Sequence, residues 1–100
     1  MKIDNKKISL MKDLCKNYKV KTLSLFGSAT RDDFNDTSDI DFAVDFNETD
    51  PLKYSDLYFN LKEKLENLLK RKIDLIEVRA INNKFFKKEL EETKISIYGK

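Results

Sequence analysis

The chain has 100 residues, of which 40% are hydrophobic and 38% are charged, so we expect residues 1–100 to form a single compact domain. Twenty Lys and Arg against eighteen Asp and Glu leave a net charge of +2, which is too close to balance to indicate a nucleic-acid-binding protein. Histidine is absent, which excludes Ser-His-Asp and Cys-His catalytic arrangements and most zinc sites.

Cysteine use and hydropathy bear on the cellular compartment. The only cysteine, Cys15, cannot form an internal disulfide, and its apolar neighbours indicate a buried thiol. No apolar segment approaches the roughly 20 residues that span a bilayer, and residues 1–10 lack the hydrophobic stretch of a signal peptide. We therefore expect a cytoplasmic protein that does not act with a membrane.

The first predicted element is a helix over residues 5–18, because apolar residues recur there at helical spacing. These residues are Ile8, Met11, Leu14, Cys15 and Tyr18. Residues 20–26 are rich in β-formers and are followed by Gly27 and Ser28, which predicts a strand that leads into a turn. A polar segment then covers residues 29–38.

The clearest strand follows this segment, because apolar and acidic residues alternate with a period of two. Its apolar face comprises Ile40, Phe42, Val44 and Phe46, and its other face comprises Asp39, Asp41, Ala43 and Asp45. Asp45 lies two further strand steps from Asp41, so we expect its side chain to be exposed to solvent.

The second half of the chain predicts a helix, a strand and a shorter helix. Thr49 or Asp50 can cap a helix with Pro51 at its first position. Its apolar stripe comprises Tyr54, Leu57, Tyr58, Leu61, Leu65, Leu68 and Leu69. Residues 73–78 read as a strand. Residues 81–90 read as a helix that presents Ile81, Phe85, Phe86 and Leu90 to the core, and residues 95–98 are ambiguous. The order predicts an α/β (α+β) fold with a small mixed sheet of about three strands covered by helices.

Two aspartates on one strand form the candidate site. Asp39 and Asp41 project from the same face with Cα atoms about 7 Å apart. Two adjacent carboxylates repel each other, and a hard divalent cation such as Mg²⁺ removes that repulsion. Asp74 completes a cluster of three carboxylates if its strand lies beside the strand of Asp41. Gly27 and Ser28 can supply a tight turn whose N–H groups and hydroxyl bind phosphate.

The motif Gly27-Ser28, ten residues, and Asp39-Ile40-Asp41, with Asp74 on a later strand, resembles the signature of the DNA polymerase β-like nucleotidyltransferase superfamily. The flanking residues are similar to its small prokaryotic branch, the minimal nucleotidyltransferase (MNT) domains. The resemblance implies a polymerase β-like fold in which Asp39, Asp41 and Asp74 bind Mg²⁺ and Asp74 helps to deprotonate the acceptor hydroxyl.

The resemblance also implies a nucleotide site in which Gly27 and Ser28 hold the β- and γ-phosphates of ATP. Arg31 matches an arginine that is common after this turn and is implied to contact the triphosphate or a partner. The family often has Gly after that arginine, whereas this chain has Asp32 and Asp33, whose negative charges oppose triphosphate binding.

MNT proteins commonly pair with HEPN-domain toxins, so the resemblance implies an antitoxin that transfers AMP from ATP to a tyrosine hydroxyl of its toxin. The short chain lacks the extra domain with which larger relatives bind a tRNA, a DNA primer or a small molecule. A nucleic acid is therefore not expected as the direct substrate, and a small-molecule acceptor is a weaker alternative. Asp32 and Asp33 keep open a second alternative, an antitoxin that neutralises its partner by binding alone.

Overall fold

The structure is a computed structural model that describes residues 4–27 and 40–99. Its elements are α1 (Asn5–Asn17), β1 (Val20–Phe26), β2 (Ile40–Phe46), α2 (Pro51–Leu69), β3 (Ile73–Glu77), the short 3₁₀ helix η2 (Val78–Ala80), α3 (Lys84–Thr93) and β4 (Ile95–Tyr98). Within this part of the chain, no helix combines the length and the apolar character that a membrane span requires.

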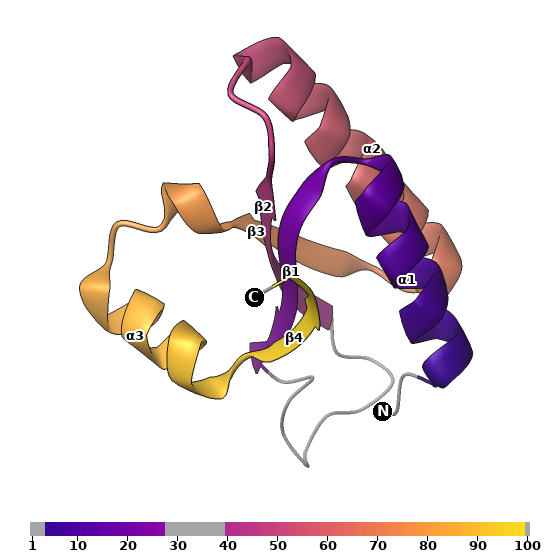
Figure 1. Cartoon of the computed structure of the whole chain (residues 1–100). Coiled ribbons are helices and arrows are strands. Elements are labelled where there is room, and N and C mark those ends of the chain that lie inside the picture. Colours follow the sequence, from indigo (N-terminus) through magenta and orange to yellow (C-terminus); the bar gives the residue numbers. More distant parts are fainter. Residues whose placement is uncertain (1–3, 28–39, 100) are drawn as a thin grey trace.

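The strands form one mixed sheet in the order β3-β2-β1-β4. β1 is antiparallel to both β2 and β4, whereas β2 and β3 are parallel. Helices α1 and α2 lie together on one face of the sheet, and α3 lies on the other (Figure 1). The predicted mixed sheet covered by helices is confirmed, with β4 as an additional strand. Because β4 has only four residues and buries only Ile97, its pattern was too short to assign from sequence.

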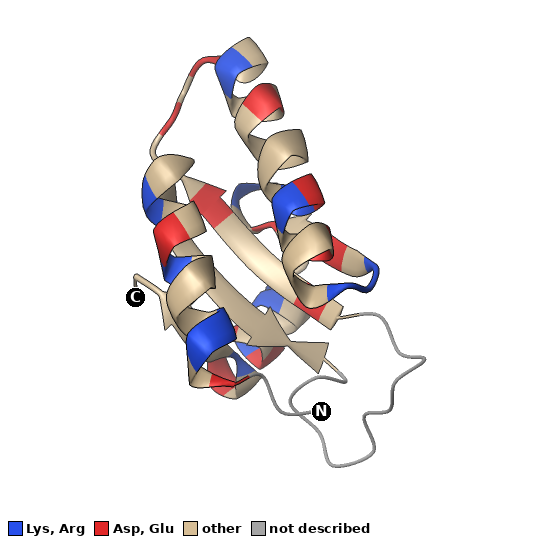
Figure 2. Cartoon of the chain, turned by 90° about the vertical axis from the view of Figure 1, so that its right-hand side faces the viewer, with Lys and Arg blue, Asp and Glu red and all other residues tan. Residues whose placement is uncertain are grey.

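The hydrophobic core lies between the sheet and the pair α1 and α2. Met11 and Cys15 of α1 are fully buried, and α2 buries Tyr54, Leu61, Leu65 and Leu69. Both helices carry charged residues, mostly basic in α1 and of both signs in α2 (Figure 2). The apolar stripes predicted for both helices are therefore confirmed as core-facing.

The predicted start of α2 is also confirmed. Asp50 is the N-cap, and its carboxylate accepts hydrogen bonds from the backbone N–H groups of Leu52 at 2.9 Å and Lys53 at 3.3 Å. Pro51 occupies the first turn, where a missing N–H is tolerated because that group has no partner within the helix. The helix ends at Leu69, and Lys70 adopts a left-handed conformation with φ of 55°.

The last helix differs from its prediction. It begins at Lys84 rather than at residue 81, because the side chain of Asn83 caps it by accepting from the N–H groups of Phe85 and Phe86. Leu90 is buried as predicted, but it is the only buried residue of α3. Phe85 and Phe86 are 87% and 37% exposed, so their assignment to the core was wrong.

Candidate active site

The acidic residues of the candidate site follow from the alternation along β2. Ile40, Phe42 and Val44 point into the core, so Asp41 must project from the opposite face of the sheet. β3 pairs with β2 in parallel, and its Asp74 stands opposite Asp41 in register. Neighbouring strands lie about 4.8 Å apart, so the two side chains leave the same face side by side. The predicted neighbourhood of Asp41 and Asp74 is confirmed.

Gly27, at the end of the neighbouring strand β1, also borders the site. It follows directly after β1, whose last residue, Phe26, pairs with Asp41. The φ angle of Gly27 is +70°, a conformation that residues with a side chain rarely adopt. A Cβ atom at this position would overlap Oδ2 of Asp41 and would lie 3.3 Å from its Cγ. Glycine is therefore required here both by the backbone conformation and by the carboxylate beside it.

The chemistry of this site fits a hard divalent cation. Asp41 and Asp74 supply carboxylate oxygens from two adjacent strands, and such oxygens are the ligands that Mg²⁺ prefers. Within residues 4–27 and 40–99, no three Asp, Glu, Cys or His side chains gather as a metal site. Asp39, the predicted third ligand, lies outside the described residues. Ser28 and Arg31 also lie outside the described residues. Of the three residues predicted to contact phosphate, the structure therefore describes only Gly27.

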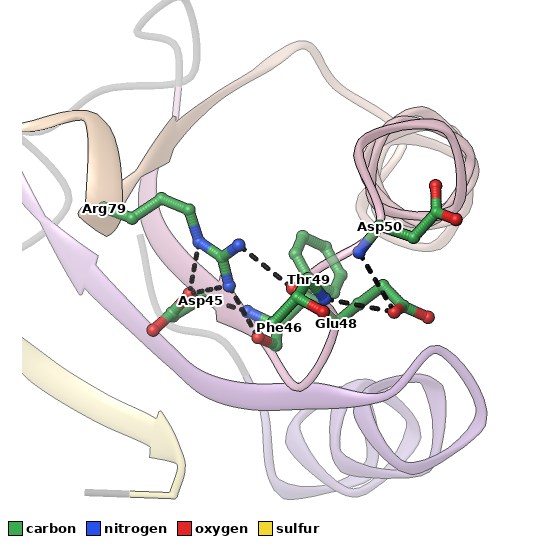
Figure 3. Close-up of polar contacts among 6 residues, drawn as sticks. All are labelled: Asp45, Phe46, Glu48, Thr49, Asp50 and Arg79. Atoms are coloured by element: carbon green, nitrogen blue, oxygen red, sulfur yellow. Dashed lines mark hydrogen bonds and ion pairs between the residues drawn. The ribbon is translucent and has the colours of Figure 1, made fainter.

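The second aspartate on the same face of β2, Asp45, has a different environment. Nε and Nη2 of Arg79 donate to Oδ1 of Asp45 at 3.1 and 2.8 Å, and Nη2 also donates to the carbonyl of Phe46 at 2.8 Å. Nη1 donates to the carbonyl of Glu48 at 3.0 Å (Figure 3). The side chain of Asp45 is only 22% exposed. The expectation that Asp45 is simply solvated was wrong, because η2 places Arg79 over it.

The sequence analysis did not identify Arg79. Its guanidinium lies 4.3 Å from the ring centroid of Tyr54, so the side chain joins η2 to the end of β2 and to the first turns of α2. Asp45 precedes Arg79 by 34 residues, and no local pattern pairs two residues at such a separation. The only available signal was an arginine that directly follows the strand predicted over residues 73–78.

Two tyrosines of α2 lie beside the edge strand β3. The Tyr58 hydroxyl donates to the carbonyl of Leu75 at 2.5 Å. Burial, followed by the nearby charges of Glu77 and Asp74, raises the pKa of Tyr58. Burial and Glu77 raise the pKa of Tyr54 to about 12. Both hydroxyls therefore stay protonated at neutral pH, which disfavours either of them as a base.

The chain is similar in sequence to a family of enzymes. The description of the family that matches residues 9–100 is polymerase beta, nucleotidyltransferase. A Methanocaldococcus jannaschii protein named as a protein adenylyltransferase is 42% identical over 80 residues, which are 80% of this chain and 79% of that protein. The protein adenylyltransferase MntA of Thermococcus cleftensis is 32% identical over 81% of this chain and 79% of its own length.

Solved structures show the same fold. A minimal nucleotidyltransferase superposes with a TM-score of 0.75 at 24% identity, covering 90% of this chain and 88% of that one. A chain from the complex of a tri-AMPylated Shewanella oneidensis HEPN toxin with an MNT antitoxin superposes with a TM-score of 0.67 at 20% identity. That match covers 98% of this chain and 74% of the other. The fold expected from the sequence motif is confirmed.

Proposed function

We propose that this chain, which belongs to the polymerase β nucleotidyltransferase family, transfers AMP from ATP to a hydroxyl group of a partner protein. Family membership makes the chain a nucleotidyltransferase. The observation that carries the proposal is the register of Asp41 with Asp74, beside a glycine that leaves space for the carboxylate of Asp41. The relatives named as protein adenylyltransferases support AMP as the transferred group and a protein as the acceptor.

Asp41 and Asp74 would hold Mg²⁺ together with Asp39, which lies outside the described residues. When bound, the ion neutralises negative charge that develops on the transferred phosphoryl group and on the leaving phosphates. The turn that begins at Gly27 would bind the triphosphate, with Ser28 and Arg31 as further contacts. Gly27 itself lies directly against the carboxylate of Asp41, so phosphates bound at Gly27 would lie beside the proposed metal site.

The chemical step requires one proton acceptor. The acceptor hydroxyl oxygen forms a bond to the α-phosphorus of ATP, the bond from that phosphorus to the bridging oxygen breaks, and pyrophosphate leaves. The hydroxyl proton goes to a carboxylate, for which Asp74 is best placed because it is exposed, whereas Asp41 is partly covered. A general base must come within hydrogen-bond reach of the proton that it removes.

A HEPN-type toxin is the partner that the comparisons support best. The solved complex with a similar fold contains a tri-AMPylated HEPN toxin, and a curated relative is the adenylyltransferase MntA. We propose that this chain acts as the antitoxin of such a protein and that a tyrosine supplies the acceptor hydroxyl. Because no histidine is present, the transfer would depend on carboxylates and the metal ion.

The test is incubation of the chain with Mg²⁺, ATP labelled at the α-phosphate, and a HEPN-domain protein from the same genome. The proposal predicts label on the HEPN protein, located on tyrosine by peptide mass spectrometry, and no label with the double variant Asp39→Ala, Asp41→Ala. ATP labelled at the γ-phosphate is the control, because that label must leave with pyrophosphate. Label that persists in the double variant would contradict the proposal.

The alternative of neutralisation by binding alone is separated by a second measurement. The HEPN protein is assayed for toxicity in the presence of the unchanged chain and of the double variant. Transfer predicts that the variant no longer neutralises the toxin, although it still binds. Neutralisation that survives the double change would favour the binding function that Asp32 and Asp33 keep open.

A further inference from the structure

Helix α3 packs only weakly on the sheet. Leu90 is its one buried residue, and the ring of Phe86 makes an edge contact with Phe26 at a centroid distance of 5.9 Å. A cavity of about 200 Å³ remains between α3 and the sheet, lined among others by Ser24, Asp45 and Leu90. Helices of this length depend on tertiary packing for their stability. A helix with a single buried residue therefore has apolar surface still available for burial.

The outer face of α3 carries an exposed aromatic side chain, Phe85, with lysines on one side of it and the exposed Glu89 one turn further along the helix. Lys84, Phe85 and Lys88 are all exposed, and their spacing places them on one side of the helix. Phe85 is 87% exposed, the highest value among the large hydrophobic residues of the described chain. Aromatic residues, Phe among them, are enriched in protein interfaces relative to the rest of the protein surface. We refer to Lys84, Phe85 and Lys88 as the α3 surface.

The charge distribution of α3 opposes its own helix dipole. The basic residues Lys84, Lys87 and Lys88 lie in the N-terminal half, and the acidic residues Glu89, Glu91 and Glu92 lie in the C-terminal half. A helix is stabilised by the reverse arrangement, with acidic residues near its start. Lys84, at the first position, is therefore unfavourable for the helix, whereas Lys88 is opposite in charge to Glu92 at i+4. The side chain of Asn83 already caps the first N–H groups, so Lys84 has no role there and is available to an anionic partner.

The position of α3 connects this surface with the active site. Phe86, next to Phe85 in the helix, contacts Phe26, and Phe26 immediately precedes Gly27. The helix lies on the same face of the sheet as Asp41 and Asp74 (Figure 1). A protein bound to α3 would thus stand beside the carboxylates rather than on the far side, which α1 and α2 cover.

We infer that the α3 surface is where the acceptor protein docks, with Phe85 as the apolar anchor and Lys84 and Lys88 bound to acidic side chains of that protein. The inference rests on the proposed function, because it assigns the binding surface of the same acceptor. A protein is favoured over a nucleic acid because the net charge of the chain is only +2 and because the exposed ring lies near acidic as well as basic side chains, Glu89 being one turn from Phe85. Docking here would raise the effective concentration of the acceptor hydroxyl at the site.

The experiment uses titration calorimetry to measure the dissociation constant of the full chain for the HEPN-domain protein that serves in the transfer assay. We expect Phe85→Ala, and separately Lys84→Glu with Lys88→Glu, to weaken binding by about tenfold or more. The matched controls are Phe59→Ala, which removes a 62% exposed phenylalanine from α2, and Lys12→Glu with Lys64→Glu, which makes the same charge change at exposed positions of α1 and α2. Both controls should bind within about twofold of the unchanged chain.

Melting temperature separates docking from folding. Glu at position 84 suits the helix dipole, whereas Glu at position 88 would repel Glu92, so Lys84→Glu with Lys88→Glu should change the melting temperature little while binding is lost. The inference would be overturned if the control variants weakened binding as much as the α3 variants do, if the α3 variants bound like the unchanged chain, or if the unchanged chain did not bind. A homodimer dissociated by Phe85→Ala would identify a second copy as the occupant, and RNA displaced by the lysine changes would identify a nucleic acid. Either result would also overturn it.

The outcomes also separate this inference from the proposed function. If the α3 variants transferred label as efficiently as the unchanged chain at limiting partner concentration, the proposed function would be supported and the docking surface would be contradicted. Selective loss of binding in the α3 variants, together with no transfer by the unchanged chain, would keep the surface and refute the transfer.

Discussion

Asp41 and Asp45 are the same residue type on the same face of the same strand, yet the groups that surround their carboxylates differ in charge. Asp45 receives two hydrogen bonds from Arg79, whose guanidinium also binds two backbone carbonyls and stacks on Tyr54. Asp41 instead stands across from a second carboxylate, Asp74, with the backbone of Gly27 against it. Asp45 is thus paired with a cation that the chain itself supplies, whereas Asp41 faces a second carboxylate, the arrangement on which the proposed Mg²⁺ site depends.

The largest effect should follow from changing the acidic pair itself. Asp41→Asn should lower transfer of AMP by about 10²- to 10³-fold, the usual loss when one group that stabilises transition-state charge is removed. Its free energy of unfolding should stay the same or rise, because the change relieves repulsion with Asp74. Initial rates of label transfer and urea unfolding curves measure the two quantities. If Asp41→Asn lowered transfer only in proportion to a loss of folded protein, the role of Asp41 in transfer rather than in folding would be contradicted.

Removing the cation should have the same effect as removing its ligand. With EDTA in excess, the unchanged chain should transfer label no faster than Asp41→Asn does, and added Mg²⁺ should restore only the unchanged chain. Transfer that persists in EDTA would contradict a role for Asp41 and Asp74 as metal ligands.

The next effect concerns Gly27, where the active site and the backbone meet. Gly27→Ala should destabilise the chain by about 1–2 kcal/mol, because a residue with a Cβ is unfavourable at positive φ. It should also lower transfer more than this destabilisation explains, because the new methyl group displaces the carboxylate of Asp41. Gly99 is the control, since it too has a positive φ of +71° but lies beside Lys21, away from the aspartates. Gly99→Ala should lower stability and leave transfer per folded molecule unchanged.

Arg79 should show the reverse of Asp41. Arg79→Ala should lower the free energy of unfolding by about 1–2 kcal/mol. We expect no larger effect, because the Arg79 side chain is 42% exposed and solvent weakens its interaction with Asp45. Transfer per folded molecule should remain within a few-fold of the unchanged chain. Differential scanning calorimetry and active-site-normalised rates provide the comparison. A loss of transfer as large as that of Asp41→Asn would show that the two ends of β2 do not have separate roles.

The smallest effect concerns pH and the buried thiol. Burial raises the pKa of Cys15 from 9.0 to about 12, and that of Tyr54 from 10.0 to about 12. A pKa that is higher in the folded state contributes stability that is complete below the unfolded value and is lost as pH rises through the folded value. The chain should therefore lose stability between pH 9.0 and about 12. Cys15 should react with a thiol reagent at pH 8 only after unfolding, and rapid reaction of the folded chain would contradict its burial.

The elements that sequence could predict are those defined by local patterns. β1 and β2 are set by β-formers, by alternation and by the glycine that follows β1, and α2 is set by the Asp50 cap, Pro51 and a long apolar stripe. α3 was placed three residues too early because the Asn83 cap was overlooked and because Phe85 and Phe86 were assumed to be buried. Apolar residues on a short helix do not reveal whether the core or a partner covers them.

The candidate site was predictable to the extent that it follows from strand geometry. The motif identified Asp41 and Gly27, but the place of Asp74 depended on which strand lies beside β2, and only the fold supplies that neighbour. The pairing of Asp45 with Arg79 could not be predicted, since it joins residues separated by 34 positions through a turn of 3₁₀ helix.

The most direct test of the central claim is a titration of Mn²⁺, in place of Mg²⁺, into the chain with bound ATP, followed by electron paramagnetic resonance of the free ion. We predict that Asp41→Asn and Asp74→Asn weaken binding of the ion by at least about tenfold, while Asp45→Asn binds it like the unchanged chain despite a lower melting temperature. Equal ion affinity in Asp41→Asn and Asp45→Asn would contradict the assignment of the metal site to Asp41 and Asp74.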